Sequence, residues 1–522
     1  MRTVAAVLLA LLLVLAYVAQ MSRWLRVLQR EHYDPSSLLR FLARWSSPQL
    51  PGAKAHQRAH PRRPFTLTHA LLVVMAGAIA LRAYDALAIA AGLYGLFCPY
   101  GLSLRGRTSR LAWTRRLRAT ALLAGGTSVV IAVLSAFSAQ PYLGAVVMVL
   151  AVPPVLDVTT RALRPLEDRK AQKFVDQAAR RLDLVRPRVV AITGSFGKTS
   201  TKNYLSALLG SDEAVVASPR SYNNRAGLSR AINENLAEGT RIFIAEMGTY
   251  GPGEIRALTS WCPPEIAVVT AIGPVHLERM KTLDVVEGAK REITERAATV
   301  VLNVDDPRLA KWPEPLRAQG KRVVTTGSTS EGVDARVLVE AGRWAIVVDG
   351  LDVGSLDAVV GVQPTNLACA LGAALALGVD RKVLLERARG VTAVANRMNV
   401  VTAPSGVVVI DDTFNANPAS AQAALTLLSS LELSGRLVVV TPGLVELGAD
   451  QFGENLRLAQ RVAALPAELV AVGRTNIAAF VAGNERQPRR FDHRDEAVAW
   501  VRSTLIPGDG VLYLNDLPDH YP

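Results

Sequence analysis

A stretch without any Asp, Glu, Lys or Arg, from residue 119 to residue 156, places the strongest limit on how this chain folds. Residues 3–20 form a second uncharged run, and residues 64–81 and 86–104 add two more apolar runs. A helix rises about 1.5 Å per residue, so roughly 20 apolar residues cross the hydrocarbon core of a bilayer. We therefore expect a multi-span helical membrane region of about five transmembrane helices over residues 1–164.

The excess of positive over negative charge lies in the same third of the chain. Residues 1–164 contain 19 Lys and Arg against four acidic residues, whereas the remainder holds 40 basic and 41 acidic residues. The net charge of +14 therefore reflects the membrane region, and we expect no nucleic acid as a partner. The three cysteines, Cys98, Cys262 and Cys369, lie far apart, which excludes a disulfide scaffold and a Cys-based zinc site.

The basic residues also orient the spans. They cluster in residues 21–63, in residues 105–118 and just after residue 160, and such clusters face the cytoplasm. Five spans, with a turn at Gln140-Pro141, place all three basic clusters on the cytoplasmic side. We therefore expect a multi-pass protein of the cell membrane. Its N-terminus would then lie outside and everything after about residue 160 in the cytoplasm. A cleaved signal peptide and a re-entrant or interfacial placement of residues 64–104 are the alternatives.

Beyond residue 186 the sequence is typical of an α/β protein. Short β-branched runs alternate with Ala- and Leu-rich helical patterns, which predicts parallel sheets built from βαβ units. The expected strands are Arg188–Thr193, Arg241–Glu246, Ile266–Ala271, Thr299–Asn303, Arg322–Thr326, Val407–Asp411, Arg436–Thr441 and Leu469–Val472. We expect a P-loop ATPase-like domain over residues 165–394 and a smaller Rossmann-like α/β domain over residues 395–522.

The segment Gly194-Ser-Phe-Gly-Lys198-Thr199 follows the first expected strand and precedes a helical pattern over Ser200–Leu209. Glycines allow the backbone to wrap a phosphate, and a helix N-terminus supplies positive potential. Lys198 would reach the β- and γ-phosphates, and the Thr199 hydroxyl would face Mg²⁺. Ile192 stands where a strict P-loop has its first glycine, so a simple strand–turn–helix is the alternative.

Further motifs follow this loop in a fixed order, and together they resemble the Mur ligases, which join amino acids or peptides to cell-wall precursors. The resemblance covers roughly residues 165–450 and is greatest to the D-alanyl-D-alanine-adding (MurF-type) UDP-N-acetylmuramoyl-tripeptide ligase. The motifs are Thr193–Thr199, Ser221–Gly227, Ala245–Gly248, Gly251–Ile255, Gly273–Glu278, Glu287–Ile293, Val301–Asp306, Gln363–Ala368, Asn396-Arg397 and Asp411–Pro418.

The resemblance implies roles for individual residues. ATP would be bound by Thr193, Gly194, Ser195, Gly197, Lys198, Thr199, Ser200, Asn366, Arg397, Asp412 and Asn415. Mg²⁺ would be held by Thr199, Glu246 and His276, and the substrate by Asn223 and Asn224. Lys198, His276 and Lys290 would be the catalytic residues, with Lys290 carbamylated. Without the resemblance, Lys290 is an ordinary solvated helix residue, His276 a loop histidine and Arg397 a surface charge.

The implied reaction is ATP-dependent amide bond formation in peptidoglycan biosynthesis, through an acyl phosphate. A muropeptide carboxylate would be joined to an amino acid or to D-alanyl-D-alanine. The muropeptide would be linked to a nucleotide, or to a lipid in the bilayer. Rival interpretations are a P-loop transport ATPase and a non-catalytic membrane scaffold. Few ionisable residues in the spans argue against transport, and the joint presence of Lys198, Glu246, His276, Lys290 and Asp412 argues against a scaffold.

The chain departs from the family pattern in three places. The family's N-terminal domain, which grips the uridine nucleotide, has no counterpart, because apolar runs occupy its place. Phe414 replaces the usual Tyr, and Asn396 stands where Gly commonly precedes the Arg. The family's Lys-Gly-Ser segment near the C-terminus is replaced by Tyr513–Tyr521. We therefore expect an intact ATP site and an altered acceptor site.

Overall fold

The structure of this protein is a computed structural model. It divides into two compact units, which are residues 1–169 with 517–522, and residues 170–516. The residues that it describes are 2–31, 33–34, 37–46, 67–99, 102, 104, 111–137, 141–210, 214–219, 221–340, 342–394, 397–414, 416–431 and 433–515.

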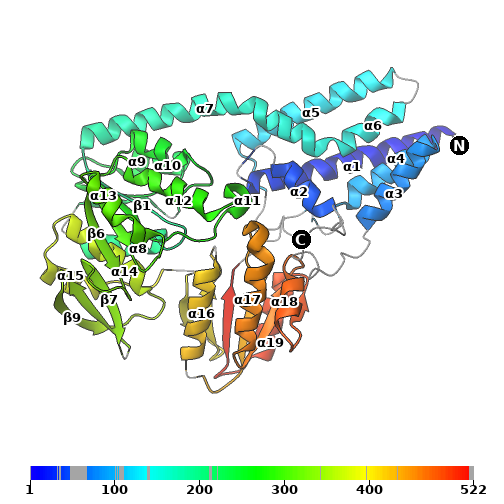
Figure 1. Ribbon diagram of the computed structural model, residues 1–522. Helices are drawn as coiled ribbons and strands as arrows, with labels where there is room; N and C mark the ends of the chain where they lie inside the picture. The colour runs from blue at the N-terminus through cyan, green and yellow to red at the C-terminus, as the bar shows by residue number, and fades with distance from the viewer. Residues whose placement is uncertain are drawn as a thin grey trace. The chain divides into compact units, whose positions relative to one another are not determined.

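The first unit is helical (Figure 1). Among the residues that the structure describes, two helices are long and apolar enough to cross a membrane, over Val4–Arg30 and Arg115–Ser135. The number rises to three if Tyr142–Leu150 and the helix that follows it, bent by 65°, are counted as one broken span. The helices are α1 (Arg2–Arg30), α2 (Ser37–Ser46), α3 (Leu67–Ala80), α4 (Tyr84–Phe97), α5 (Arg115–Ala136), α6 (Pro141–Leu150) and α7 (Val152–Val185), which continues into the second unit.

Within the described residues, the expected five full-length spans are not reproduced. The runs over residues 64–104 form α3 and α4, of 14 residues each, because the polar segment around Arg82 and Asp85 interrupts them. At 1.5 Å per residue such a helix is about 21 Å long, less than the roughly 30 Å of a hydrocarbon core. The predicted turn at Gln140-Pro141 does fall between α5 and α6, although Gln140 itself lies outside the described residues.

Helix α4 packs closely on α1 through small residues. A Cβ atom on Gly92 would lie 2.6 Å from Leu12 Cγ, and one on Gly95 would lie 2.6 Å from the Cβ atom of Ala16. At the end of α4, Arg23 of α1 donates hydrogen bonds to main-chain carbonyls that include Gly95 O (2.7 Å) and Leu102 O (3.0 Å). The guanidinium thus satisfies carbonyl groups that the end of a helix leaves without partners.

The second unit contains two sheets. The first has nine strands in the order β2-β3-β1-β4-β5-β6-β7-β8-β9, and all pairs from β2 to β7 are parallel. Its strands are β1 (Arg188–Thr193), β2 (Val215–Ala217), β3 (Ile242–Glu246), β4 (Ile266–Val269), β5 (Thr299–Asn303), β6 (Arg322–Gly327), β7 (Ala335–Glu340), β8 (Arg343–Val348) and β9 (Leu351–Asp357).

Helices cover both faces of this sheet, which explains its nearly unbroken apolar strands. One face packs against α8 (Lys198–Leu209), α14 (Pro364–Ala376) and α15 (Arg381–Ala388). The other packs against the end of α7, α9 (Arg225–Asn235), α10 (Glu254–Trp261), α12 (Leu283–Arg291) and α13 (Pro313–Ala318). The short helix α11 (Leu277–Met280) precedes α12.

The second sheet has the order β10-β11-β15-β12-β13-β14, and only the β10–β11 pair is antiparallel. Its strands are β10 (Asn399–Thr402), β11 (Val408–Asp412), β12 (Leu437–Thr441), β13 (Ala467–Val472), β14 (Arg489–Phe491) and β15 (Gly510–Leu514). Helices α16 (Pro418–Ser430) and α17 (Gln451–Ala463) lie side by side on one face with α18 (Ile477–Gly483) (Figure 1), and α19 (Arg494–Thr504) covers the other.

The α/β prediction is confirmed, and all eight expected strands are present within two residues of their expected ends. The prediction of parallel sheets was wrong at two places. Strand β8 pairs antiparallel with both β7 and β9, and β10 pairs antiparallel with β11. Turns of only a few residues join β7 to β8 and β8 to β9, and such connections are too short for the crossover that a parallel pair needs.

Candidate active site

The loop after β1 is shaped to surround an anion. Gly194 (φ +153°) and Gly197 (φ +77°) adopt backbone conformations that residues with a side chain rarely adopt. A Cβ atom on Gly197 would lie 2.1 Å from Asn366 Oδ1, and one on Gly194 would lie 2.0 Å from Thr270 Oγ1. Helix α8 begins directly after Gly197, so its first amide groups and positive dipole end face the loop.

Lys198 is the first residue of α8, and its Nζ atom donates a hydrogen bond to Gly194 O at 2.7 Å. Burial lowers the pKa of Lys198 to about 8, the Glu246 carboxylate opposes this shift, and the Arg397 cation adds to it. A phosphate group beside Lys198 would favour the charged form of the amine. The glycine loop is also bonded to the segment after β4, because Ser195 Oγ accepts a hydrogen bond from Gly273 N at 2.9 Å.

Glu246 ends β3, next to β1, and its carboxylate accepts three hydrogen bonds from side chains. Thr199 Oγ1 and Lys202 Nζ donate to Oε2 at 3.0 and 3.1 Å, and Asn223 Nδ2 donates to Oε1 at 3.0 Å. The predicted residues Thr199, Glu246 and Asn223 are therefore brought together, and Lys202 is a partner that sequence reasoning missed. Asn224 instead caps the N-terminus of α9, since its side chain accepts a hydrogen bond from Gly227 N at 2.9 Å.

Lys290 lies on α12 and is only 2% exposed. The interpretation of Lys290 as a solvated helix residue was therefore wrong, because α12 turns this position toward the sheet. Burial lowers the pKa of Lys290 well below that of a free lysine, and the Lys198 cation lowers it further. An amine with a lowered pKa is more often in the neutral, nucleophilic form.

His276 precedes α11 and has a left-handed backbone (φ +53°). Its Nδ1 atom lies 2.5 Å from Oε2 of Glu446, a residue of the loop after β12. The ring of Tyr250 packs against the imidazole, with a centroid separation of 4.6 Å. Glu446 is a second residue that the motif search missed, because it lies outside the matched motifs.

A pocket of about 270 Å³ opens beside the glycine loop. Five of the residues predicted to bind ATP line it: Gly197, Ser200, Asn366, Arg397 and Asp412. Other polar side chains of the lining were not predicted, among them Thr270, Asn303, Asp305, Asp306, Gln363 and Ser420. Thr193 and Ser195 are buried at the base of the loop, and the predicted Asn415 lies outside the described residues.

Asp412 leaves a hydrogen-bonding group for a ligand. Its Oδ2 atom is buried and has no hydrogen-bond partner among the described residues, while Oδ1 accepts from Met398 N at 3.3 Å. Burial raises the pKa of the Asp412 carboxyl, although Ser420 and the Arg397 cation oppose this shift. A buried polar atom without a partner is costly in free energy, so a hydroxyl donor such as a ribose would fit here.

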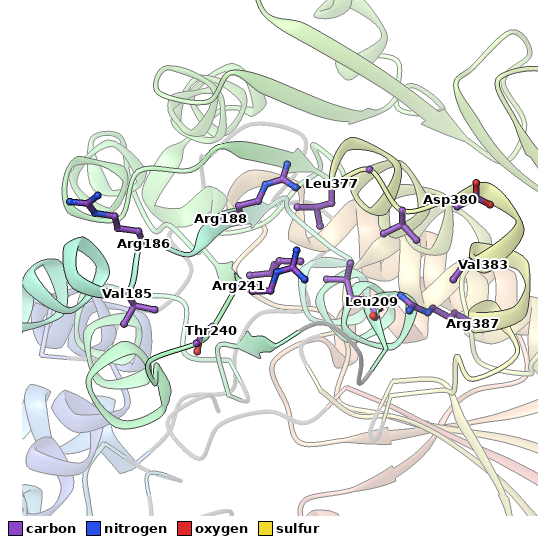
Figure 2. A pocket seen from close by; sticks show the side chains of 14 residues that line it. Val185, Arg186, Arg188, Leu209, Thr240, Arg241, Leu377, Asp380, Val383 and Arg387 are labelled. Atoms are coloured by element: carbon purple, nitrogen blue, oxygen red, sulfur yellow. Dashed lines mark hydrogen bonds between the residues drawn. The ribbon is translucent and has the colours of Figure 1, made fainter.

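A larger cavity of about 620 Å³ lies elsewhere, at the amino ends of β1 and β3 (Figure 2). Two of its arginines bind main-chain carbonyls at helix ends: Arg387 donates to Leu209 O at 2.6 Å, and Arg188 to Leu377 O at 2.9 Å. Helix C-termini carry partial negative charge, which such cations neutralise. Ligands of open α/β sheets bind at the carboxyl ends of the strands, so we assign this cavity a structural role.

The residues of the glycine loop fit ATP and Mg²⁺ by their chemistry. Glycine is required at two positions of the loop, since a Cβ atom on Gly194 or Gly197 would collide with Thr270 or Asn366. Thr199 and Glu246 lie together and offer two oxygen ligands, and His276 offers a nitrogen ligand. Within the described part of the chain, no group of three or more His, Cys, Asp and Glu side chains could hold a metal by itself. Mg²⁺ in proteins keeps several waters and binds through one or two carboxylates together with substrate phosphates.

Two family models match the chain, the Mur ligase middle domain over residues 192–348 and the Mur ligase, glutamate ligase domain over residues 396–514. Over 355 residues, 62% of this chain and 69% of the relative, it is 31% identical to the UDP-N-acetylmuramoyl-tripeptide–D-alanyl-D-alanine ligase of Mycobacterium tuberculosis. The enzyme of the same name from Bacillus subtilis is 28% identical over 266 residues, 50% of this chain and 57% of the relative.

Among solved structures, the MurF ligase from Thermotoga maritima in complex with ADP superposes with a TM-score of 0.57 at 26% identity. The match covers 66% of this chain and 80% of that chain. The resemblance predicted from the ordered motifs is confirmed by these matches. The chain therefore belongs to the Mur ligase family of ATP-dependent ligases.

Proposed function

We propose that this protein is a MurF-like ligase that joins D-alanyl-D-alanine, or an amino acid, to a muropeptide carboxylate at the expense of ATP. The main support is that Thr199, Lys202 and Asn223 donate hydrogen bonds to the two carboxylate oxygens of Glu246, next to the glycine loop. A scaffold without catalytic function would not need a buried carboxylate held between a phosphate loop and a substrate-binding segment.

In the first step, a carboxylate oxygen of the muropeptide attacks the γ-phosphorus of ATP. The bond from the γ-phosphorus to the bridging oxygen breaks, which gives an acyl phosphate and ADP. Lys198 and the amides of the loop stabilise the charge on the phosphate oxygens. Thr199, Glu246 and His276 would hold Mg²⁺, and a metal ion bound there would supply positive charge to neutralise the phosphates.

In the second step, the amine of the incoming amino acid or dipeptide attacks the acyl carbon. Phosphate leaves, and one proton is lost from the new amide nitrogen. This chemistry needs no nucleophilic side chain of the protein, so the enzyme acts mainly by positioning and charge stabilisation. Asn366, Arg397 and Asp412 line the pocket that would take the nucleoside part of ATP, and Asn415 is proposed to contribute to it.

Lys290 is proposed to be carbamylated. Burial and the neighbouring Lys198 cation both favour the neutral amine, which is the form that attacks CO₂. The carbamate carries a negative charge, which would attract the neighbouring Lys198 cation instead of repelling it. The carbamate would help to hold Mg²⁺ near the carboxylate that is phosphorylated.

The N-terminal region is proposed to anchor the enzyme in the cell membrane, with both α/β domains in the cytoplasm and the N-terminus outside. Exposed apolar side chains such as Val7, Leu11 and Val14 of α1 and Leu122 and Leu134 of α5 suit contact with lipid. The acceptor would then be the nucleotide-linked muropeptide, or its lipid-linked form drawn from the same bilayer.

The test is phosphate release by the detergent-purified full-length protein with ATP and Mg²⁺. Nucleotide-linked and lipid-linked muropeptides are supplied separately, each with and without D-alanyl-D-alanine, and the product is weighed by mass spectrometry. We expect release that depends on the acceptor and a product that is heavier by the dipeptide. Lys198→Ala and Lys290→Ala should each abolish the reaction, whereas Lys311→Ala, which alters an exposed lysine of the same domain, should not.

Each arm has a separate meaning. Turnover only with the lipid-linked form would make the membrane region part of the substrate site, and turnover with the nucleotide-linked form would make it an anchor. Activity that survives Lys290→Ala but not Lys198→Ala would favour another ATPase function. No acceptor-dependent release in either arm would refute the muropeptide assignment.

A further inference from the structure

We propose that Glu446 is a positioning residue that holds His276 in the orientation needed to bind a metal ion. This inference rests on the proposed role of His276 as a ligand of Mg²⁺. Glu446 lies in the loop after β12, which belongs to the second sheet of this unit, and His276 lies between β4 of the first sheet and α11, so Glu446 would act on the metal site through His276.

The contact with Glu446 determines which nitrogen of the imidazole is left for a metal ion. His276 Nδ1 and Glu446 Oε2 lie 2.5 Å apart, and a carboxylate oxygen can only accept, so the proton lies on Nδ1. Nε2 is then the ring nitrogen that remains for a metal. A carboxylate on the second ring nitrogen is the usual partner of a metal-binding histidine, since it fixes the tautomer and the ring orientation.

The surroundings hold both partners in place. His276 (φ +53°) and Glu446 (φ +63°) each adopt the left-handed conformation, which is strained for a residue other than glycine. Such a conformation persists only where packing enforces it. Tyr250 packs on the imidazole, and the guanidinium carbon of Arg279 lies 4.9 Å from the centre of the Tyr250 ring.

The segment that carries Glu446 also approaches the first sheet through its backbone. Gly448 (φ +60°) lies so close to Leu277 that an added Cβ atom would be 3.3 Å from Leu277 O. The residue after His276 is therefore in contact with the residue two places after Glu446. Two neighbouring contacts, one through side chains and one through the main chain, define how the loop after β12 meets the start of α11.

A functional consequence follows from the origin of the two residues. If His276 binds a metal ion best when Glu446 holds it, then metal binding favours the arrangement in which the two sheets are in contact. By the same coupling, contact between the two sheets raises the affinity for the metal ion. The carboxylate thus links metal binding to the approach of the second α/β domain.

The experiment measures Mn²⁺ affinity by electron paramagnetic resonance on the full-length protein in detergent, with saturating ADP. The variants are Glu446→Ala, Glu446→Gln, His276→Ala and the Glu446→Ala/His276→Ala double variant. Glu485→Gln is the matched control, because Glu485 is an exposed carboxylate beyond α18 in the same domain. ADP affinity without metal is measured in parallel and should be unchanged in all variants.

We expect Glu446→Ala to weaken Mn²⁺ binding about ten-fold, the lower end of the effect of removing such a partner. Glu446→Gln should retain most of the affinity, since its amide oxygen still accepts from Nδ1. In the His276→Ala background, Glu446→Ala should have no further effect, because the residue that it positions is gone.

The outcomes separate this inference from the function on which it rests. If His276→Ala weakens Mn²⁺ binding and Glu446→Ala does not, His276 is a ligand and the positioning role of Glu446 is refuted. If Glu446→Ala is equally harmful with and without His276, Glu446 acts in some other way and the inference is again refuted. If His276→Ala leaves Mn²⁺ affinity unchanged, the proposed metal site itself is wrong.

Discussion

Lys202 Nζ lies 3.1 Å from Glu246 Oε2, and the two side chains are only 2% and 1% exposed. Lys202 also donates to Ser218 O at 2.8 Å. Lys202 and Lys198 lie one helical turn apart on α8, so one face of this helix presents a lysine to the phosphate loop and another to the carboxylate beside it. The carboxylate of Glu246 thereby keeps a counter-charge when no metal ion is bound.

Replacing Lys202 should destabilise the central domain strongly. Lys202→Met keeps much of the apolar stem but leaves the Glu246 carboxylate buried without its cation, and breaking a buried ion pair in this way costs about 3 kcal/mol or more. Urea unfolding followed by tryptophan fluorescence measures the effect. Arg474→Met is the control, because it breaks an ion pair with Asp492 in which both side chains are 58% exposed, and should cost less than about 1 kcal/mol. Equal losses in the two variants would contradict the role given to Lys202.

The glycine loop offers a matched pair of substitutions. Gly197→Ala and Gly239→Ala both introduce a methyl group at a left-handed position, with φ of +77° and +87°. Only at Gly197 does the new atom collide, 2.1 Å from Asn366 Oδ1, while nothing lies within 4 Å of it at Gly239. We expect Gly197→Ala to weaken ATP binding at least ten-fold, and Gly239→Ala to lower stability by about 1 kcal/mol at unchanged ATP affinity. Fluorescence titration with a labelled ATP analogue tests both, and similar ATP affinities in the two variants would contradict the assignment of the loop.

Two thiols of the second unit should be inert in the folded protein. Burial raises the pKa of Cys262 and of Cys369 to about 12 in each case, and both residues are fully buried. A higher thiol pKa means less thiolate, so at pH 8 only about one molecule in ten thousand carries the reactive form. Ellman's reagent should therefore leave both cysteines unmodified at pH 8 and react with them in urea, whereas an exposed Ser503→Cys thiol should react at once. Rapid modification of Cys262 or Cys369 in the native protein would show that the core opens readily.

The strands that could be predicted from the sequence are those that are buried on both faces. Strands β1 and β5 are buried on both faces and appear as unbroken β-branched runs, so their bounds could be predicted. Strands β8 and β9 are partly exposed, and Gly354 and Asp352 interrupt the pattern of β9, so neither strand was expected. Strand β15 lies between β11 and β12 although it comes last in the chain, and no local pattern reveals such an order.

The same distinction applies to the site. Gly194, Lys198, Thr199 and Glu246 were found because they belong to short motifs with a chemical meaning. The contact of Glu446 with His276 joins residues 170 positions apart, and nothing in the motif around either one points to the other. Burial of Lys290 escaped prediction because it depends on how α12 is rotated against the sheet, which a helix of nine residues does not determine by itself.

The close packing of α4 on α1 provides a test of the helical unit. Gly95→Ala would place a methyl group 2.6 Å from the Cβ atom of Ala16 and 2.7 Å from Val149 Cγ1, so α1, α4 and α6 would have to separate. We expect this overpacking to cost about 1–3 kcal/mol, seen as a lower midpoint of thermal unfolding in detergent. Gly77→Ala is the control, since α3 has nothing within 4 Å of the new atom and a helical glycine-to-alanine change is favourable. A helical unit that served only as a loose tether would tolerate both changes, and equal stability of the two variants would therefore contradict the packing of α1 against α4.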